Sequence, residues 1–215
     1  MSRMAVPIVS VFIVFSLILT ASATTVTIGE IFSESEVTTP LVIHDVTDLA
    51  TAGVKITFDP SVILITSAKK GNLPSFIANV ERAAEGWVKV GAYTTGSGLN
   101  GDVKLADLTI VPRGSYGELS DLSISVESLS DSGYKTIDAT VIDGFFYIGM
   151  NGDVHADRVI DASDSEYIAR GIAGDPGYPP KFGPSEVSGD GILDAYDCVY
   201  LARHAAGIAG YETLR

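Results

Sequence analysis

Acidic residues are the side chains whose spacing points most clearly to chemistry. In residues 153–164 carboxylates stand at positions 1, 5, 9 and 12 of a twelve-residue segment, and residues 186–197 repeat this arrangement. Hard cations such as Ca²⁺ take six to eight oxygen ligands, which a twelve-residue calcium loop supplies from positions 1, 3, 5, 7, 9 and 12. The spacing therefore predicts two calcium sites. Mg²⁺ is disfavoured, because it gives up its water shell reluctantly.

Each expected site combines side-chain oxygens with one backbone carbonyl, at position 7. The alternative interpretation is that the acidic residues only cap two helix N-termini, but capping explains one or two carboxylates per helix rather than four. The expected ligands are Asp153, His155, Asp157, the carbonyl of Val159, Asp161 and Asp164 in the first loop, and Glu186, Ser188, Asp190, the carbonyl of Ile192, Asp194 and Asp197 in the second.

The first loop departs from the ideal pattern at two positions. Position 6 normally carries Gly in a left-handed conformation, and here it is Arg158, which costs about 1–2 kcal/mol of backbone strain. Position 3 is His155, and an imidazole is a poor ligand for a hard ion. We therefore expect weaker calcium binding in the first loop, with water in place of the histidine as one solution.

The two loops belong to an internal duplication. A shift of 33 residues aligns Asp157 with Asp190 and Asp164 with Asp197, and the match continues through a Tyr, an Arg and several Gly residues. Each loop precedes an apolar segment with helical periodicity, at residues 163–172 and 195–208. A connection rich in Pro and Gly, residues 174–184, joins them.

Residues 24–148 have the pattern of an all-β sandwich of the jelly-roll type. Short runs rich in Val, Ile, Thr and Phe are separated by turn residues, which predicts about nine strands. The boundary with the following part, residues 149–152, reaches at most about 14 Å, so we expect the two parts to lie close together. The expected strands are 25–28, 41–46, 53–58, 62–67, 76–81, 87–93, 103–111, 122–126 and 139–148.

Residues 1–23 are predicted to be a signal peptide. Arg3 precedes an apolar run at residues 5–19, and Ala21, Ser22 and Ala23 form a small-residue cleavage site. The alternative is a retained anchor, but the run is shorter than the roughly 20 residues of a membrane span. The mature chain is therefore expected to be secreted and to lack a membrane span.

Charge and motif content disfavour several function classes. The net charge of −13 disfavours nucleic-acid binding, because the phosphate backbone is also negatively charged. Cys198 is the single cysteine, so no intramolecular disulfide can form. The sequence has no H-E-x-x-H, G-x-S-x-G or C-x-x-C pattern, and we expect a protein that is not an enzyme.

Two family resemblances follow from these motifs. The second loop contains D-G-I-L-D-A-Y-D at residues 190–197; with its final Asp and its duplication, it resembles the dockerin module of cellulosome-type assemblies, over residues 150–215. Residues 24–149 resemble the partner module, cohesin. That resemblance rests on residues 40–50, on residues 53–62 with their strand and D-P-S-V turn, and on the later strands 105–110 and 143–148.

The resemblance implies a non-catalytic scaffold protein that assembles through calcium-dependent cohesin–dockerin contacts, with a role in polysaccharide breakdown as one setting. The partner would be a cohesin- or dockerin-bearing chain, and a copy of this chain bound head-to-tail is one candidate. In dockerins the contact residues lie at loop positions 10 and 11 and further along each helix. Here these residues are Ala162, Ser163, Arg170, Ala195, Tyr196 and Arg203.

The alternative function is a secreted carbohydrate-binding protein with a calcium-stabilised attachment module. Trp87 and Tyr93 share one face of a predicted strand, and exposed aromatic rings can stack on sugars. The competing interpretation, which we favour from the sequence, is that Trp87 packs in the core.

Overall fold

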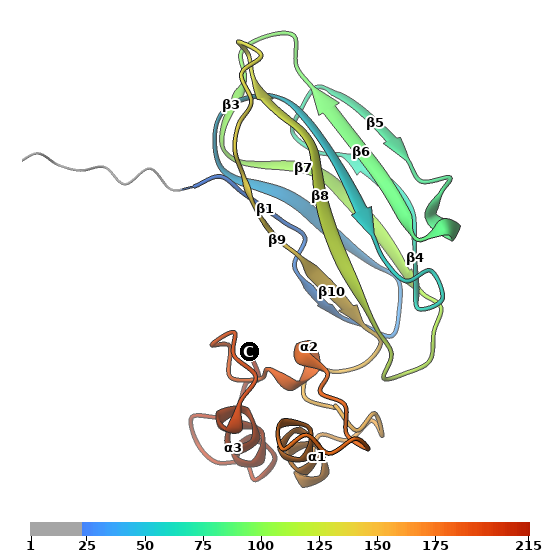
Figure 1. The fold of residues 1–215 in the computed structure, drawn as a ribbon, viewed down its shortest axis with the longest axis vertical. Helices are drawn as coiled ribbons and strands as arrows, with labels where there is room; N and C mark the ends of the chain where they lie inside the picture. Colours follow the sequence, from blue (N-terminus) through green and yellow to red (C-terminus); the bar gives the residue numbers. More distant parts are fainter. Residues whose placement is uncertain (1–22) are drawn as a thin grey trace, which may run out of the picture.

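The computed structural model describes residues 23–215, so the predicted signal peptide lies outside the described residues except for Ala23. The chain forms two parts: a β-sandwich, residues 24–148, and a helical segment, residues 149–215, at one end of it (Figure 1). Among the described residues, no helix combines the length and apolar character needed to cross a membrane.

Ten strands build the sandwich, and alternating inward and outward side chains define it. Inward residues from both layers form one continuous core. The strands are β1 (Thr25–Thr27), β2 (Glu30–Phe32), β3 (Val37–Thr57), β4 (Ile63–Lys70), β5 (Ser75–Asn79), β6 (Trp87–Tyr93), β7 (Leu99–Pro112), β8 (Leu119–Asp131), β9 (Thr140–Ile142) and β10 (Gly144–Tyr147), with a 3-10 turn at Ala83–Glu85 between β5 and β6.

Strand β3 belongs to both layers. Its first half pairs with β1 and β7, and its second half pairs with β6 and β8. Between the halves the register with β7 shifts, and Asp45 and Asp48 have left-handed φ angles of 53° and 57°. Such bulges bend a strand, which lets β3 cross from one sheet to the other. The expectation of two separate strands at 41–46 and 53–58 is therefore wrong, because the chain between them bends without leaving the ladder.

The two layers have the strand orders β9-β1-β3-β7-β4 and β2-β10-β8-β3-β6-β5. The predicted all-β sandwich is confirmed. Two local predictions are corrected: the expected strand 139–148 is divided at Asp143 into β9 and β10, and the short strand β2 was not predicted. Neither β2 nor β9 is longer than three residues, so the alternation that marks a strand in a sequence is absent.

The helical segment contains three short helices: α1 (Ala162–Ile172), α2 (Phe182–Ser185) and α3 (Ala195–Ala205). Helices α1 and α3 confirm the two predicted helices, whereas α2 lies at the end of the Pro- and Gly-rich connection, where no helix was predicted. Asp161 and Asp194 cap α1 and α3, each with a reciprocal capping box. A small separate core of Val154, Ile168, Val187, Tyr200 and Leu201 holds the segment together.

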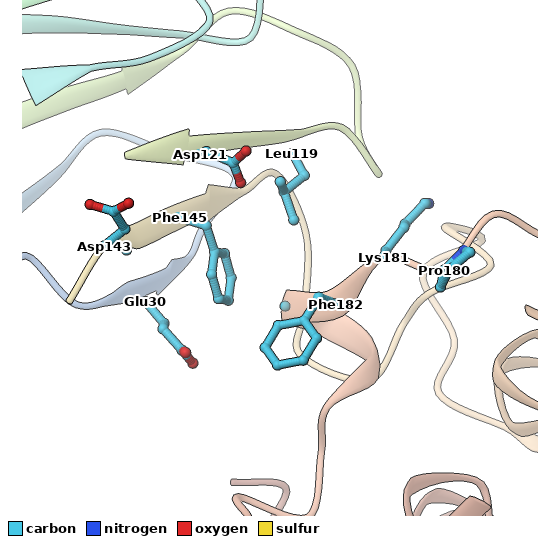
Figure 2. A pocket seen from close by; sticks show the side chains of 10 residues that line it. Glu30, Leu119, Asp121, Asp143, Phe145, Pro180, Lys181 and Phe182 are labelled. Carbon is cyan, nitrogen blue, oxygen red and sulfur yellow. The ribbon is translucent and has the colours of Figure 1, made fainter. Parts of the chain in front are cut away.

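The helical segment packs directly on the end of the sandwich near β10, as the short boundary predicted (Figure 1). Gly183 of α2 faces Phe145 of β10, and a Cβ atom at Gly183 would lie 2.5 Å from that ring. Tyr147, the last residue of β10, is fully buried at the junction. A cavity of about 470 Å³ remains between β10 and α2, lined by Phe145, Phe182 and other residues shown in Figure 2.

Candidate functional site

The carboxylate at position 12 closes each acidic loop. In the second loop, Asp197 accepts hydrogen bonds from the backbone N–H groups of Val187 at 3.0 Å, Ser188 at 3.1 Å and Asp194 at 2.9 Å. Asp164 accepts the corresponding bonds from positions 3 and 9 of the first loop, both at 2.9 Å. Both carboxylates are fully buried, so they hold the ends of their loops together from inside.

The hydrogen bonds accepted by positions 1 and 5 also have counterparts in the two loops. The position 1 carboxylate accepts the N–H of position 5 at 3.2 Å in each loop, from Asp157 to Asp153 and from Asp190 to Glu186. The position 5 carboxylate accepts the N–H of position 7 at 2.9 Å in each loop. The duplication read from the sequence is therefore a duplication of backbone geometry as well.

Positions 4 and 6 are left-handed in both loops. In the second loop they are Gly189 and Gly191, with φ angles of 77° and 78°. In the first loop they are Ala156 and Arg158, with φ angles of 62° and 74°. The left-handed conformation expected at Arg158 is confirmed, and Ala156 adds a second residue in this costly conformation, about 1–2 kcal/mol for a residue with a Cβ.

Replacing Gly191 with Ala isolates this backbone cost. A Cβ atom at Gly191 would meet nothing within 4 Å, so the change adds conformational strain without a clash. We expect Gly191→Ala to lower the free energy of unfolding of the helical segment by about 1 kcal/mol, measured by urea unfolding followed by circular dichroism. Gly96→Ala in the sandwich is the control, because φ at Gly96 is outside the left-handed range. Equal stability of Gly191→Ala and wild type would contradict the prediction.

Burial divides the predicted ligands into two groups. Asp153, Asp164 and Asp197 are fully buried, whereas the carboxylates at positions 5 and 9 are exposed. Burial raises the pKa of Asp164, and the backbone N–H groups that it accepts oppose this rise. Burial lowers the pKa of Lys181, while the carboxylates of Asp153 and Asp164 favour its charged form. Lys181 is thus a cation that interacts with positions 1 and 12 of the first loop.

The second loop fits a calcium ion by its donor chemistry. Its candidate ligands are all oxygen atoms, and the two left-handed positions are glycines. The first loop fits less well, because His155 and Lys181 bring a nitrogen ligand and a positive charge to it. Within residues 23–215, no three Asp, Glu, His or Cys side chains converge closely enough to hold an ion as they stand. Calcium in these loops therefore stays a prediction.

The residues predicted to contact a partner fall into two kinds. Ala162, Ala195 and Tyr196 are exposed at the starts of α1 and α3, and Ser163 is half-buried there. Arg170 and Arg203 are also exposed, but both are engaged within the chain as described next.

Each arginine forms a clip with the tyrosine eight residues later. The guanidinium of Arg170 lies 4.7 Å from the ring centroid of Tyr178, and that of Arg203 lies 5.0 Å from the ring of Tyr211. Both tyrosines also pack edge to face on a helix tyrosine, for example Tyr200. The repeat had matched these residues without indicating their contact. The clips hold the chain that follows each helix against that helix.

The outward face of β5, β6, β3 and β8 carries exposed apolar side chains. Ile77 of β5 is 73 % exposed and Tyr93 of β6 is 49 % exposed. Ile77 lines a shallow hollow of about 230 Å³ together with Gly53 and Gly91. Trp87 lies on this outward face as well, half-buried between the ammonium groups of two lysines, so the expectation that it packs in the core is wrong. Its side chain alternates with inward Val88, as the strand requires.

Comparison with known proteins identifies the sandwich. No family model and no curated protein matches the chain. A non-cellulosomal cohesin from the hyperthermophilic archaeon Archaeoglobus fulgidus superimposes with a TM-score of 0.53 at 18 % identity, over 62 % of this chain and 96 % of that one. The sandwich has the cohesin fold.

Bacterial structures give the same result. The sixth cohesin of scaffoldin B from Acetivibrio cellulolyticus, solved with a Cel5 dockerin mutant, matches with a TM-score of 0.53 at 20 % identity, over 59 % of this chain and 99 % of that one. A cohesin from a type I cohesin–dockerin complex of Clostridium thermocellum matches with a TM-score of 0.51 at 15 % identity, over 59 % and 99 %. The matched share of the chain corresponds to the size of the cohesin-fold sandwich.

Proposed function

We propose that this chain is a secreted, non-catalytic assembly protein with two docking surfaces. The cohesin-fold sandwich binds one protein partner through the outward face of β5, β6, β3 and β8. The helical segment is a dockerin-like module that binds a second partner through α1 and α3, and calcium in its second loop stabilises it. Cleavage after Ala23 would release the mature chain, and sequencing of the secreted protein from Thr24 would support this step.

The observation that carries the proposal is a pair of large apolar side chains left uncovered on the outward face of a cohesin-fold sandwich. Ile77 and Tyr93 expose large apolar side chains there, and Ile77 lines a shallow hollow with Gly53 and Gly91. The helical segment packs on the sandwich end instead, against β10, and leaves this face open (Figure 1). Solved cohesins of the same fold include complexes with dockerins.

The helical segment offers a second apolar surface. Tyr196 and Val199 of α3 are 48 % and 44 % exposed, and Ile172 at the end of α1 is also exposed. Calcium would hold the loop that begins α3 through the carboxylates of Glu186, Asp190, Asp194 and Asp197, the hydroxyl of Ser188 and the carbonyl of Ile192. Its role is to fix the direction of the helix, because the ligands span the residues that begin it.

A second copy of the chain is the simplest partner to test. We expect the mature chain to associate with itself in sedimentation velocity runs with calcium, and to be monomeric with a chelator. Ile77→Asp should weaken association at least about tenfold, because it places a charge in an apolar contact. Thr66→Asp, on the exposed side of β4 in the other layer, is the control. Undiminished association of Ile77→Asp would exclude this face.

If the chain does not associate with itself, the partner is another protein. Secreted proteins from the source culture are then passed over three columns, which carry the wild-type chain, Ile77→Asp and Tyr196→Asp, each with and without chelator. The proposal expects one captured protein to depend on Ile77 and another to depend on calcium and Tyr196. Capture that is the same on all three columns would contradict both docking surfaces.

Carbohydrate binding is the second candidate function, because Trp87 and Tyr93 lie on the same outward face. Lys55 and Lys89 place their ammonium groups 5.3 Å and 5.9 Å from the Trp87 ring, which occupies it with cation–π contacts. Because the two lysines already contact the Trp87 ring, we favour protein docking over sugar stacking on this face. Calcium-independent retardation in polysaccharide gels that Trp87→Ala abolishes would support carbohydrate binding instead.

A further inference from the structure

The first loop contacts the sandwich, and the contact is made by the residue that breaks the calcium pattern. The guanidinium of Arg158 pairs with the carboxylate of Glu34, which follows β2, at 2.6 Å. The same group lies 4.2 Å from the ring centroid of Tyr116, in the turn before β8. A glycine at position 6 could make neither contact.

The backbone and first ligand of this loop are bound to the sandwich too. The Asp153 carboxylate accepts a hydrogen bond from the Tyr116 hydroxyl at 2.5 Å, on the oxygen that also accepts the N–H of Arg158. The Asp153 carbonyl accepts one from the Tyr147 hydroxyl at 2.6 Å. With the other carboxylate oxygen held by the N–H of Asp157, both oxygens of the first predicted ligand are engaged by the protein.

The first loop already has a positive charge beside it, the ammonium group of Lys181. The Lys181 ammonium donates to the carbonyl of Val154 at 3.0 Å and interacts with the buried carboxylates of Asp153 and Asp164. A divalent cation entering the loop would be repelled by Lys181 and would have to displace the Tyr116 hydroxyl.

The second loop lacks all of these features. Its position 6 is Gly191, and among residues 23–215 no hydrogen bond or ion pair joins a side chain of the second loop to the sandwich. Across the junction, the pKa of Glu30 is raised by burial and by repulsion from Glu186. A cation in the second loop would relieve that repulsion.

We propose that the first loop is a docking element for the sandwich in place of a calcium site. Arg158 and Asp153 bind Glu34 and Tyr116, and the chain binds one calcium ion, in the second loop. The left-handed Arg158 is then explained, because its side chain gains a partner that offsets its backbone strain. The calcium in the second loop rests on the proposed function, whereas the docking contact is independent of it.

Calcium titration calorimetry of the mature chain tests the inference that only the second loop binds calcium. We expect one ion per chain, lost in Asp190→Ala and retained in Asp157→Ala. Two ions, one of them lost in Asp157→Ala, would overturn the inference and restore the weaker first site expected from the sequence. Binding of no calcium at all would overturn the single-ion statement and the calcium part of the proposed function together.

A double-mutant cycle in the presence of chelator tests the contact between Arg158 of the first loop and Glu34 of the sandwich. Limited proteolysis at residues 149–152 reports opening of the junction. Arg158→Ala and Glu34→Ala should each speed cleavage roughly fivefold, and the double variant no further, because both remove one contact. Arg170→Ala is the matched control, because Arg170 is an exposed arginine whose partners Glu166, Asp175 and Tyr178 all lie within the helical segment. Additive effects, or none, would overturn the docking contact.

Discussion

Asp197→Ala is expected to unfold the helical segment while the sandwich stays folded. Asp197 is fully buried and accepts three backbone N–H groups, two from the start of the second loop and one from its ninth position. Alanine leaves these three donors without their acceptor; the hydrogen bonds from Val187 and Ser188 are buried, and the one from Asp194 is partly buried. An unsatisfied buried donor costs about 1–3 kcal/mol, so we expect a loss of about 3–5 kcal/mol of unfolding free energy.

The helical segment has a small core, so we expect this loss of unfolding free energy to be enough to unfold it. Circular dichroism at 222 nm during urea unfolding, with chelator present, measures it without any contribution from metal. Asp190→Ala is the control, since Asp190 is exposed and accepts a single N–H within its own loop. Asp197→Asn should be intermediate, because an amide keeps one acceptor oxygen. The prediction fails if Asp197→Ala and Asp190→Ala lose the same amount of stability.

The parts of the fold with regular periodicity could be predicted from the sequence. Strand β6 has the predicted bounds, and Val54, Ile56 and Phe58 point inward as their alternation indicated. The helices follow from the duplication, since each begins directly after a position 9 aspartate that caps it. Local pattern carries this information because side-chain burial in a strand or helix has a fixed period.

Features that depend on distant residues could not be predicted. The crossing of β3 between the layers depends on its partners β7 and β8, and the alternation on either side of the bend gives no sign of it. Trp87 is an exception, because the alternation of β6 puts it opposite the buried Val88 and Val90, and this local signal could have placed it on the outward face. The sequence marked Arg158 as an anomaly, yet its partner Glu34 lies 124 residues away, and only the fold brings the two together.

The candidate site was predicted unevenly for the same reason. The hydrogen bonds of positions 1, 5 and 12 recur in both loops, which agrees with the duplication, whereas the ligand roles of the twelve residues stay predictions. The partner role predicted for Arg170 and Arg203 remains a prediction, and their intramolecular clips with tyrosines reduce the side-chain freedom with which they could meet a partner. The spacing of a motif predicts the backbone position of a residue, whereas the contacts of its side chain depend on the tertiary fold.

Tyr147→Ala is expected to separate the unfolding of the two parts of the chain. Tyr147 ends β10, is fully buried, and packs edge to face on Phe32 with ring centroids 6.1 Å apart. Its hydroxyl donates to Asp153, and Lys181 lies 5.8 Å from its ring centroid. The residue thus contacts β2, the first loop and the connection before α2 at once. Removing a buried aromatic ring costs about 3–5 kcal/mol, and the cavity would open at the junction.

A cavity already lies between β10 and α2, so the junction is not completely packed in wild type (Figure 2). Wild type should unfold with a single calorimetric transition, and Tyr147→Ala with two. Tyr147→Phe, which keeps the ring and removes only the hydroxyl, is the matched control and should lose about 1–2 kcal/mol while keeping one transition. Two transitions in wild type, unchanged in Tyr147→Ala, would mean that the parts are stable independently. A single transition in wild type would instead mean that the two parts unfold together. The junction would then fix the orientation of the two proposed docking surfaces relative to each other.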